Sequence, residues 1–357
     1  MKNRYLIIAT SIYPPDVGGP AVYFASLKEA LEVRGWNVRV LVRPGIVSFL
    51  HAAGSDSVVL VHGTPRLVLA AAIARWLRPF QLVVRIGGDF FWERAVEGGK
   101  FFGTLRDFYI KGGARNPRHW LLAGLVGFAY RQANALVFTS AFLRDIYIPF
   151  YRLNEKKIHL IAHPVPSLIT QPAQDTTPVA PGARLVYAGR FLTLKNLEML
   201  LEVFTEARKT HPNITLTLIG GGPESVKLKA QSEKLGIQNC VVFKKPVSHD
   251  EALSEISTSD LVVLPSLSEV SPNLFFDALA AATPVLATQE NGYREIFQGI
   301  FTFFNPMDRT DFLAKLNTLL APGALERMRE RLGTFRYDRT WADAASDYEE
   351  ILNLHGE

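Results

Sequence analysis

The chain of 357 residues is 48% hydrophobic and 20% charged, which is typical of a globular protein with more than one domain. No apolar stretch reaches the roughly 20 uncharged residues that a membrane-spanning helix needs. The single cysteine, Cys240, excludes an internal disulfide and a cysteine-only metal site, and it favours a reducing compartment such as the cytoplasm.

The net charge of +5 is unevenly distributed along the chain. Residues 1–165 carry a net charge of +11, and residues 166–357 carry −6. This asymmetry predicts a negatively charged partner for the N-terminal half, such as an anionic membrane surface, an anionic acceptor or nucleic acid. Charge pairing between the two halves is the alternative.

The first half of the chain alternates short apolar runs with helical patterns. Because parallel strands need crossover helices between them, this alternation predicts a doubly wound α/β domain over residues 1–165. The predicted strands are residues 5–10, 38–42, 58–62, 82–85, 135–139 and 158–161, and the predicted helices are residues 21–34, 66–77 and 119–131.

Residues 166–182 are rich in Pro, Thr and Gln without periodicity and are predicted to be a linker. The alternation then resumes, so we expect a second doubly wound domain over residues 183–335. Residues 336–357 end in a helix, which we expect to pack back toward the N-terminal domain. Two such sheets bind ligands in a cleft at the carboxyl ends of their strands. The predicted strands are residues 184–188, 215–219, 240–243, 261–264 and 284–287, and the helices are residues 197–210, 224–235, 249–256 and 341–354.

The turn after the apolar strand 261–264 carries the most informative chemistry. Ser271 is predicted to be the N-cap of a helix and Pro272 its first residue, which leaves unpaired backbone N–H groups for an anion. Glu269 precedes this helix, and Asp277 lies within its first two turns. Two carboxylates beside an anion site predict a ligand with both phosphates and hydroxyls, such as a sugar nucleotide. An ordinary cap with an ordinary helix carboxylate is the alternative.

Two cations follow the first strand of the second domain. Arg190 and Lys195 at that strand end, facing a helix N-terminus of the same sheet, predict a clamp for a diphosphate. Gly18 and Gly19 follow the first strand of the chain and allow close approach of the backbone to a phosphate or sugar. A plain flexible turn is the alternative. For Gly221, within the run 220–222, a tight strand–helix turn is the stronger alternative.

Asp89 follows the predicted strand 82–85, so we expect it to point into the cleft. There it would orient a hydroxyl nucleophile or bind a sugar hydroxyl. A helix cap or turn residue is the alternative. The eight histidines are scattered, so no metal site is expected.

Together these motifs resemble those of retaining GT-B glycosyltransferases, in particular glycosyltransferase family 4. The order of the motifs along nearly the whole chain supports the resemblance. The segments that carry it are Pro14-Pro15 with Gly18-Gly19, Gly189-Arg190 with Lys195, Gly221-Gly222-Pro223, Pro265-Ser266 followed by Glu269 and Asp277, residues 284–288, and Asn291-Gly292 with Glu295.

The resemblance implies two Rossmann-like domains that face a central cleft, with the donor bound by the C-terminal one. It implies that Arg190 and Lys195 hold the donor diphosphate and that Asp277 binds the ribose hydroxyls. Glu269 would contact the donor sugar and phosphate with the backbone at the helix start. The remaining donor contacts implied are Gly18, Gly19, Gly221, Val247, Ser271, Pro272, Asn273 and Leu274.

The resemblance further implies retaining transfer of a sugar from a UDP- or GDP-sugar to a sugar or lipid-linked acceptor, without a metal or cofactor. Such transfer belongs to the synthesis of glycans, cell-envelope polysaccharides or glycolipids. Asp277 departs from the glutamate usual in the family, residues 244–246 replace a usual glycine, and Asp89 stands where relatives often have a histidine. A non-catalytic sugar-nucleotide-binding protein and a GT-B nucleotide-sugar epimerase are therefore the alternative functions.

Residues 90–130 interleave aromatic and basic side chains. One interpretation is a surface that binds the inner face of the cytoplasmic membrane and admits a lipid-linked acceptor. The alternative is that the aromatic side chains are core. Nucleic acid is not expected, because a sugar-nucleotide site accounts better for the motifs.

Overall fold

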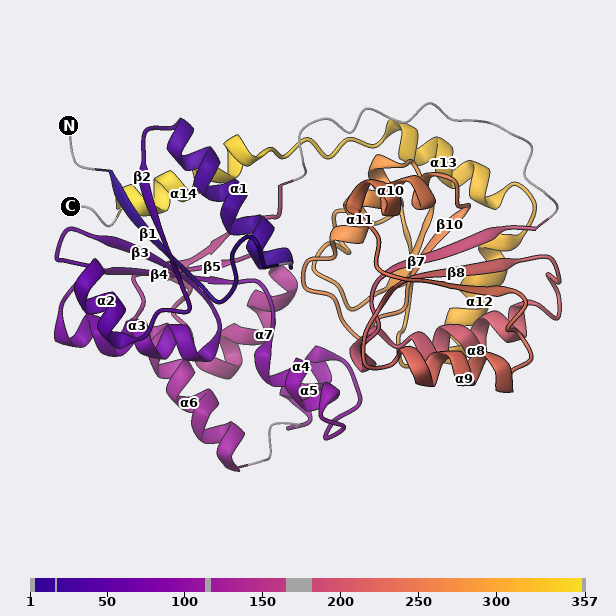
Figure 1. The fold of residues 1–357 in the computed structure, drawn as a ribbon, viewed down its shortest axis with the longest axis horizontal. Helices are drawn as coiled ribbons and strands as arrows, with labels where there is room; N and C mark the ends of the chain where they lie inside the picture. The colour runs from indigo at the N-terminus through magenta and orange to yellow at the C-terminus, as the bar shows by residue number, and fades with distance from the viewer. Residues whose placement is uncertain (1–3, 17, 113–116, 165–181, 355–357) are drawn as a thin grey trace. The chain divides into compact units, whose positions relative to one another are not determined.

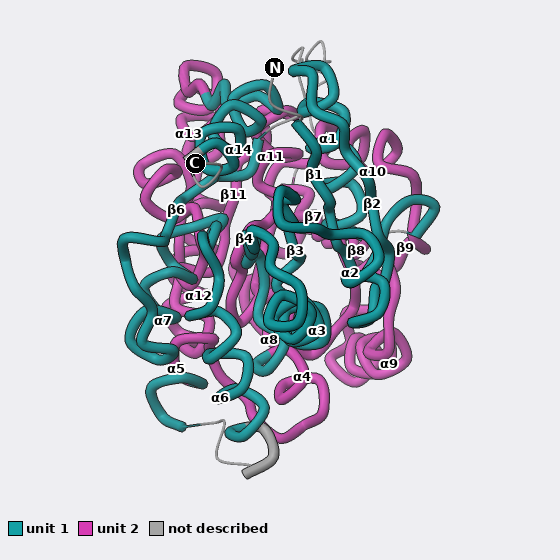
Figure 2. The backbone as a smooth tube through the Cα atoms, turned by 90° about the vertical axis from the view of Figure 1, so that its left-hand side faces the viewer, with its two compact units in different colours: residues 1–92, 108–167, 337–357 teal, residues 93–107, 168–336 magenta. Residues whose placement is uncertain are grey.

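The computed structural model of the chain describes residues 4–16, 18–112, 117–164 and 182–354 (Figure 1). All of the expected linker except Gly182 lies outside these residues. The chain divides into two compact units (Figure 2). Unit 1 comprises residues 1–92, 108–167 and 337–357, and unit 2 comprises residues 93–107 and 168–336. Residues 93–107, which the sequence placed in the first domain, thus group with unit 2.

Unit 1 contains a six-stranded parallel sheet in the order β2-β1-β3-β4-β5-β6. Its middle strands are continuous apolar runs because helices cover both faces of the sheet. In β1 and β3, for example, Ile8 stands opposite Leu60 and both are fully buried. The strands are β1 (Tyr5–Thr10), β2 (Asn37–Val42), β3 (Val58–His62), β4 (Gln81–Ile86), β5 (Ala135–Phe138) and β6 (Ile158–Leu160).

The helices of unit 1 include the C-terminal one. α14 (Trp341–Leu354) packs against α1 (Gly19–Val33), and its Tyr348 and Ile351 join a core cluster with Tyr23 (Figure 1). Residues 337–357 therefore complete the unit in which the chain begins. The other helices of unit 1 are α2 (Ile46–Ala52), α3 (Pro65–Leu77), α6 (Pro117–Gln132), α7 (Ala141–Tyr151) and the short η1 (Glu155–Lys157); α4 (Phe90–Glu97) and α5 (Leu105–Ile110) lie at the ends of the 93–107 segment.

Unit 2 contains a second six-stranded parallel sheet, in the order β12-β11-β10-β7-β8-β9. All four residues of β10 are buried, as a central strand requires. The strands are β7 (Arg184–Arg190), β8 (Thr215–Gly221), β9 (Val241–Lys244), β10 (Leu261–Leu264), β11 (Val285–Thr288) and β12 (Thr302–Phe304). The helices are η2 (Thr193–Lys195), α8 (Leu197–Ala207), α9 (Ser225–Lys234), α10 (His249–Ser257), α11 (Asn273–Ala280), α12 (Arg309–Leu320) and α13 (Ala324–Thr334).

The two doubly wound α/β units agree with the fold class predicted from the sequence. The sequence pattern did not reveal α7, which carries Pro149 within it, because a proline normally ends a helical pattern. α2, α12, α13 and β12 were also missed. No helix in the described ranges is long and apolar enough to cross a membrane.

The aromatic segment 90–130 divides between core and surface. Phe91, Trp92 and Phe108 are buried, as the core alternative requires. Trp120 and Phe128 on α6 are more than half exposed. The segment is therefore neither wholly core nor a single aromatic surface.

Candidate functional site

The candidate site lies at the carboxyl ends of β7 and β10, two neighbouring strands in the middle of the unit 2 sheet. The loops that follow parallel neighbours leave the same edge of the sheet and so lie together. One backbone hydrogen bond joins the two loops, from the N–H of Leu267 to the carbonyl oxygen of Leu194, at 2.9 Å. Lys195 and Glu269 are carried by these two loops.

Lys195 and Glu269 form a largely buried ion pair. Lys195 Nζ lies 2.5 Å from Glu269 Oε1, and the side chains are 20% and 11% exposed. Ser266 Oγ donates to the same carboxylate oxygen at 2.6 Å. Burial of two charges is costly unless they are paired and hydrogen-bonded, and here both conditions are met. The sequence predicted both charged residues but not the role of Ser266.

Arg190 is the last residue of β7, the strand that precedes the loop of Lys195. Tyr187 Oη donates to the carbonyl oxygen of Arg190 at 3.0 Å. Burial raises the pKa of Tyr187 well above its ordinary value, the negative charge of Glu269 raises it further, and Arg190 opposes them. The charges of Glu269 and Arg190 therefore both act on the phenol of Tyr187. The Arg190 residue itself is exposed at the carboxyl end of the strand.

The glycine-rich turn after β8 is required by close backbone packing. A Cβ atom on Gly220 would lie 1.9 Å from the carbonyl oxygen of Gly189, and one on Gly222 would lie 2.3 Å from that of Phe191. Both glycines also have positive φ, at 139° and 158°. Gly221 has room for a side chain, and its carbonyl oxygen accepts from Phe191 N at 2.9 Å. The tight-turn alternative therefore describes Gly220 and Gly222.

The helix after β10 begins one residue later than predicted. Pro272 is the N-cap and Asn273 the first helical residue, so Ser271 does not cap the helix. Ser271 Oγ instead lies 3.2 Å from Tyr293 Oη. Proline has no side-chain acceptor, so it cannot satisfy the first N–H groups of α11, including those of Asn273 and Leu274. These groups remain suited to an anion.

Asp277 lies further along α11 and is paired with a residue that sequence reasoning missed. His249 Nε2 lies 2.8 Å from Asp277 Oδ1. Burial raises the pKa of Asp277, and His249 opposes that rise. His249 is the first residue of α10, two positions after the exposed Val247. The histidine at the start of α10, the helix that precedes β10, was the available signal.

The loop after β11 holds the backbone of Glu269 in place. Glu269 N donates to Glu290 O at 2.8 Å, and Gly292 N donates to Glu269 O at 2.9 Å. Asn291 is buried; its Nδ2 donates to Thr288 O at 2.6 Å, and its Oδ1 accepts from Tyr293 N at 2.9 Å. The Asn291-Gly292 motif therefore holds the backbone of Glu269 in position.

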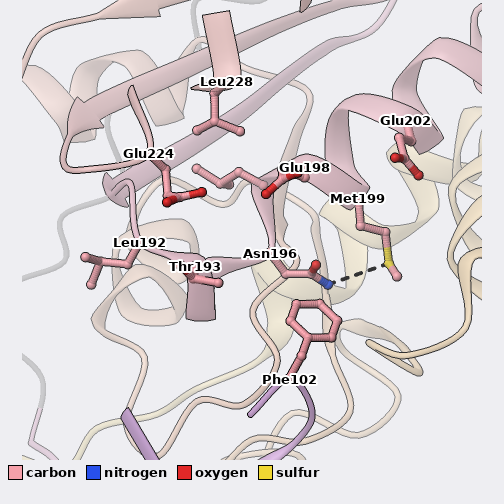
Figure 3. Close-up of a pocket in the computed structure, with 10 residues that line it drawn as sticks. Phe102, Leu192, Thr193, Asn196, Glu198, Met199, Glu202, Glu224 and Leu228 are labelled. Atoms are coloured by element: carbon pink, nitrogen blue, oxygen red, sulfur yellow. Dashed lines mark hydrogen bonds between the residues drawn. The ribbon is translucent and has the colours of Figure 1, made fainter. Parts of the chain in front are cut away.

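Residues 93–107 also support the two loops. Glu97 Oε1 accepts from Leu194 N at 2.9 Å, and Ser268 Oγ accepts from Leu105 N at the same distance. A cavity of about 250 Å³ adjoins the η2 loop, and Phe102 contributes to its wall (Figure 3). Its carboxylates are Glu198, Glu202 and Glu224, of which Glu198 and Glu224 pair with Lys227.

The residues predicted in the first half of the chain occupy two different environments in unit 1. Gly18 is the N-cap of α1 and Gly19 its first residue, with φ of 156° at Gly18. They thus lie at a helix N-terminus that has no side-chain cap.

Asp89 is buried, with 1% exposure, and does not point into open space. It caps α4: its Oδ1 accepts from Trp92 N at 2.6 Å, and its Oδ2 accepts from Tyr147 Oη at 2.6 Å and from Tyr109 Oη. Burial raises its pKa, and the tyrosine hydrogen bonds oppose that rise. The geometry of Asp89 is therefore that of the cap alternative.

No group of His, Cys, Asp and Glu side chains within the described ranges is arranged to hold a metal ion. The end of β7 and the loop that follows it carry the positive charges of Arg190 and Lys195.

Comparisons with known proteins agree with this geometry. Residues 175–338 match the family described as Glycosyl transferases group 1. The D-inositol 3-phosphate glycosyltransferase of Corynebacterium jeikeium is 30% identical over 142 residues, which are 36% of this chain and 34% of that enzyme. The chain thus spans only about a third of the length of that curated relative.

Two solved structures are similar over nearly their whole length. Sucrose-phosphate synthase from Thermosynechococcus elongatus superposes with a TM-score of 0.74 at 17% identity, covering 98% of this chain and 99% of that one. Anabaena HepE in complex with UDP-glucose superposes with a TM-score of 0.70 at 14% identity, with coverage of 98% and 99%. The chain therefore has the GT-B fold of these structures, and its residues 175–338 match the family described as Glycosyl transferases group 1.

Proposed function

We propose that the chain is a retaining glycosyltransferase that moves a sugar from a nucleotide-diphosphate sugar to an acceptor hydroxyl. The observation that carries the proposal is the Lys195–Glu269 ion pair beside Arg190 and the start of α11. A diphosphate needs cations and N–H donors, and a sugar needs a carboxylate acceptor. This edge of the unit 2 sheet offers all three.

Lys195 has three N–H donors and spends one on Glu269, which leaves two for a phosphate oxygen. The guanidinium of Arg190 supplies the second cation. As the bond between the anomeric carbon and the diphosphate breaks, negative charge grows on the leaving oxygen. Both cations and the α11 N-terminus stabilise that charge, an effect worth about 10²–10³ in rate for one such donor.

Glu269 keeps one carboxylate oxygen for the donor sugar, because Lys195 and Ser266 both bind Oε1. In the proposed reaction the acceptor oxygen bonds to the anomeric carbon as the diphosphate leaves. The acceptor proton passes to the departing diphosphate, so no further base is required. Asp277, which is paired with His249, is proposed to bind the ribose. Val247 and Gly221 are proposed to contact the donor as well.

The acceptor is proposed to be a sugar or a lipid-linked sugar bound by unit 1, with Gly18 and Gly19 contacting the donor phosphate. The net charge of +11 over residues 1–165 supports an anionic acceptor or membrane surface at the cytoplasmic face. UDP- and GDP-sugars are the proposed donors. The HepE structure with UDP-glucose, on the same fold, supports a uridine nucleotide.

A thermal-shift screen over UDP- and GDP-sugars would identify the donor. We then expect nucleotide release that depends on a sugar acceptor, and a product whose anomeric configuration, read by NMR, matches the donor. Lys195→Met should abolish release, whereas Lys209→Met, at a 67% exposed position on the same unit, should leave it unchanged.

Two other outcomes would contradict the proposal. Conversion of the sugar without an acceptor would make the protein an epimerase. Stabilisation by a nucleotide sugar without any turnover would make it a binding protein.

A further inference from the structure

A groove on unit 1 lies between α3 and α6, two helices that pack against each other. Its volume is about 840 Å³. Its walls are apolar: Ile73 and Trp76 come from α3, and Leu125 and Phe128 come from α6. None of these residues belongs to the proposed transfer site in unit 2.

The rim of the groove exposes large apolar side chains to solvent. Trp76 is 86% exposed, and Phe128, Ile73 and Leu125 are each exposed by about half. Leu77 and Leu121, on the same two helices, are exposed as well. Isolated exposed apolar residues are normal, but a contiguous set around a groove marks an interaction surface.

The two helices that form the groove carry positive charge and no carboxylate. Their charged residues are Arg66 and Arg75 in α3 and Arg118 and Arg131 in α6. Within the groove, Arg75 Nε donates to Phe80 O at 2.9 Å, and its guanidinium also donates to Gln132 O. Arg75 thus donates to backbone carbonyl oxygens, and neither α3 nor α6 carries a carboxylate that could neutralise its charge.

We propose that this groove docks the protein on an anionic lipid bilayer, with Trp76 and Phe128 inserted at the interface and an acyl chain lying in the groove. An indole ring suits the boundary between head groups and acyl chains. Arginines beside the apolar surface attract anionic head groups, each contributing a further factor of roughly five in binding. A second copy of the chain is a poorer occupant, because a two-fold interface would place like charges against each other.

Flotation of the protein with vesicles tests the docking. Binding to phosphatidylcholine vesicles that contain phosphatidylglycerol should exceed binding to phosphatidylcholine alone and should weaken as salt is raised. The pair Trp76→Ser and Phe128→Ser should lower binding by about tenfold or more. Val33→Ser with Val226→Ser, at positions elsewhere that are 84% and 80% exposed, should not. Arg78 directly follows α3, and Arg78→Gln should lower binding by about fivefold at low salt, whereas Lys209→Gln in unit 2 should not.

The assay contains neither donor nor acceptor, so its result is independent of the proposed glycosyl transfer. The proposal is overturned if the protein does not bind anionic vesicles, or if the Trp76 and Phe128 variant binds as well as wild type while thermal unfolding shows both folded. It is also overturned if light scattering finds a dimer that this variant disrupts. That result would make a second copy the occupant.

Discussion

Lys195 Nζ and Glu269 Oε1 lie 2.5 Å apart although their residues belong to different loops, 74 positions apart in sequence. Each side chain is mostly buried, and Ser266 donates to the oxygen that Lys195 binds. The pair can therefore serve stability, transfer or both, and the two roles can be separated by experiment.

Removal of one partner of the pair leaves an uncompensated charge. We expect Lys195→Met or Glu269→Leu alone to lower the free energy of unfolding by about 3 kcal/mol, less where solvent screens the remaining charge. The double variant should recover most of that loss, because it leaves no unpaired charge. Urea unfolding measures this, and transfer should be lost in all three variants. Activity in the stable double variant would show that the pair is structural only.

Asp277 has a pKa raised by burial, so its charged form is disfavoured in the fold. Below its ordinary pKa, Asp277 is protonated in both the folded and the unfolded chain. As pH rises from the ordinary to the raised pKa, the unfolded chain releases this proton first, so the folded state loses stability. Asp277→Asn keeps an acceptor for His249 and should therefore raise the melting temperature at pH 7 but not at acidic pH.

The same variant should weaken nucleotide binding by roughly tenfold or more, because a charged acceptor for the ribose is lost. Isothermal titration measures this. Unchanged affinity would contradict the proposed ribose contact.

The carboxylate of Asp89 accepts hydrogen bonds from the hydroxyls of Tyr109 and Tyr147 and from the backbone N–H of Trp92 in α4. Asp89→Leu leaves these donors unsatisfied and should cost several kcal/mol of stability. Asp89→Asn retains the cap and should cost about 1 kcal/mol, with transfer close to wild type. Loss of transfer in a stable Asp89→Asn protein would restore the catalytic role that the sequence suggested.

Gly220 admits no side chain, since a Cβ there would lie 1.9 Å from Gly189 O. Gly220→Ala should lower the free energy of unfolding by more than about 2 kcal/mol, because the backbone at Gly189 or Gly220 would have to move to admit the methyl group. Gly333 in α13 has nothing within 4 Å of such a Cβ. Gly333→Ala is the matched control and should be neutral or stabilising by about 0.5 kcal/mol. Equal stability of the two variants in denaturant would contradict the close approach.

His62 ends β3 and contacts Ser11 Oγ through Nδ1, at 3.0 Å. Burial, followed by the charge of Arg85, lowers the pKa of His62 from 6.5 to about 3. The unfolded chain therefore takes up a proton that the fold resists. The stability that depends on neutral His62 is fully present above pH 6.5 and is lost as pH falls toward 3. By pH 5 the free energy of unfolding should have fallen by about 2 kcal/mol.

His62→Asn keeps a polar contact with Ser11 but does not titrate. Its free energy of unfolding should fall less than that of wild type between pH 7 and pH 5, by about the same 2 kcal/mol. Parallel acid slopes for the two proteins would show that His62 is protonated in the fold.

The pattern of apolar and charged residues along the chain is enough to predict the two doubly wound units and the charged residues that follow β7 and β10. Continuous apolar runs predict buried parallel strands, and the order of the strand-end motifs predicts which loops carry charge. Arg190, Lys195, Glu269 and Asp277 were all identified in this way. The helix start at Asn273 was missed by one residue, because Ser-Pro allows a cap at either position.

The partners of these residues follow from contacts that exist in the folded chain alone. His249 reaches Asp277, Ser266 reaches Glu269, and the 93–107 segment joins unit 2 through contacts between residues distant in sequence. Asp89 illustrates the reason most clearly. A loop aspartate has the same sequence signal whether it faces solvent or tyrosines, and only the packing of α5 and α7 around it makes Asp89 a buried cap.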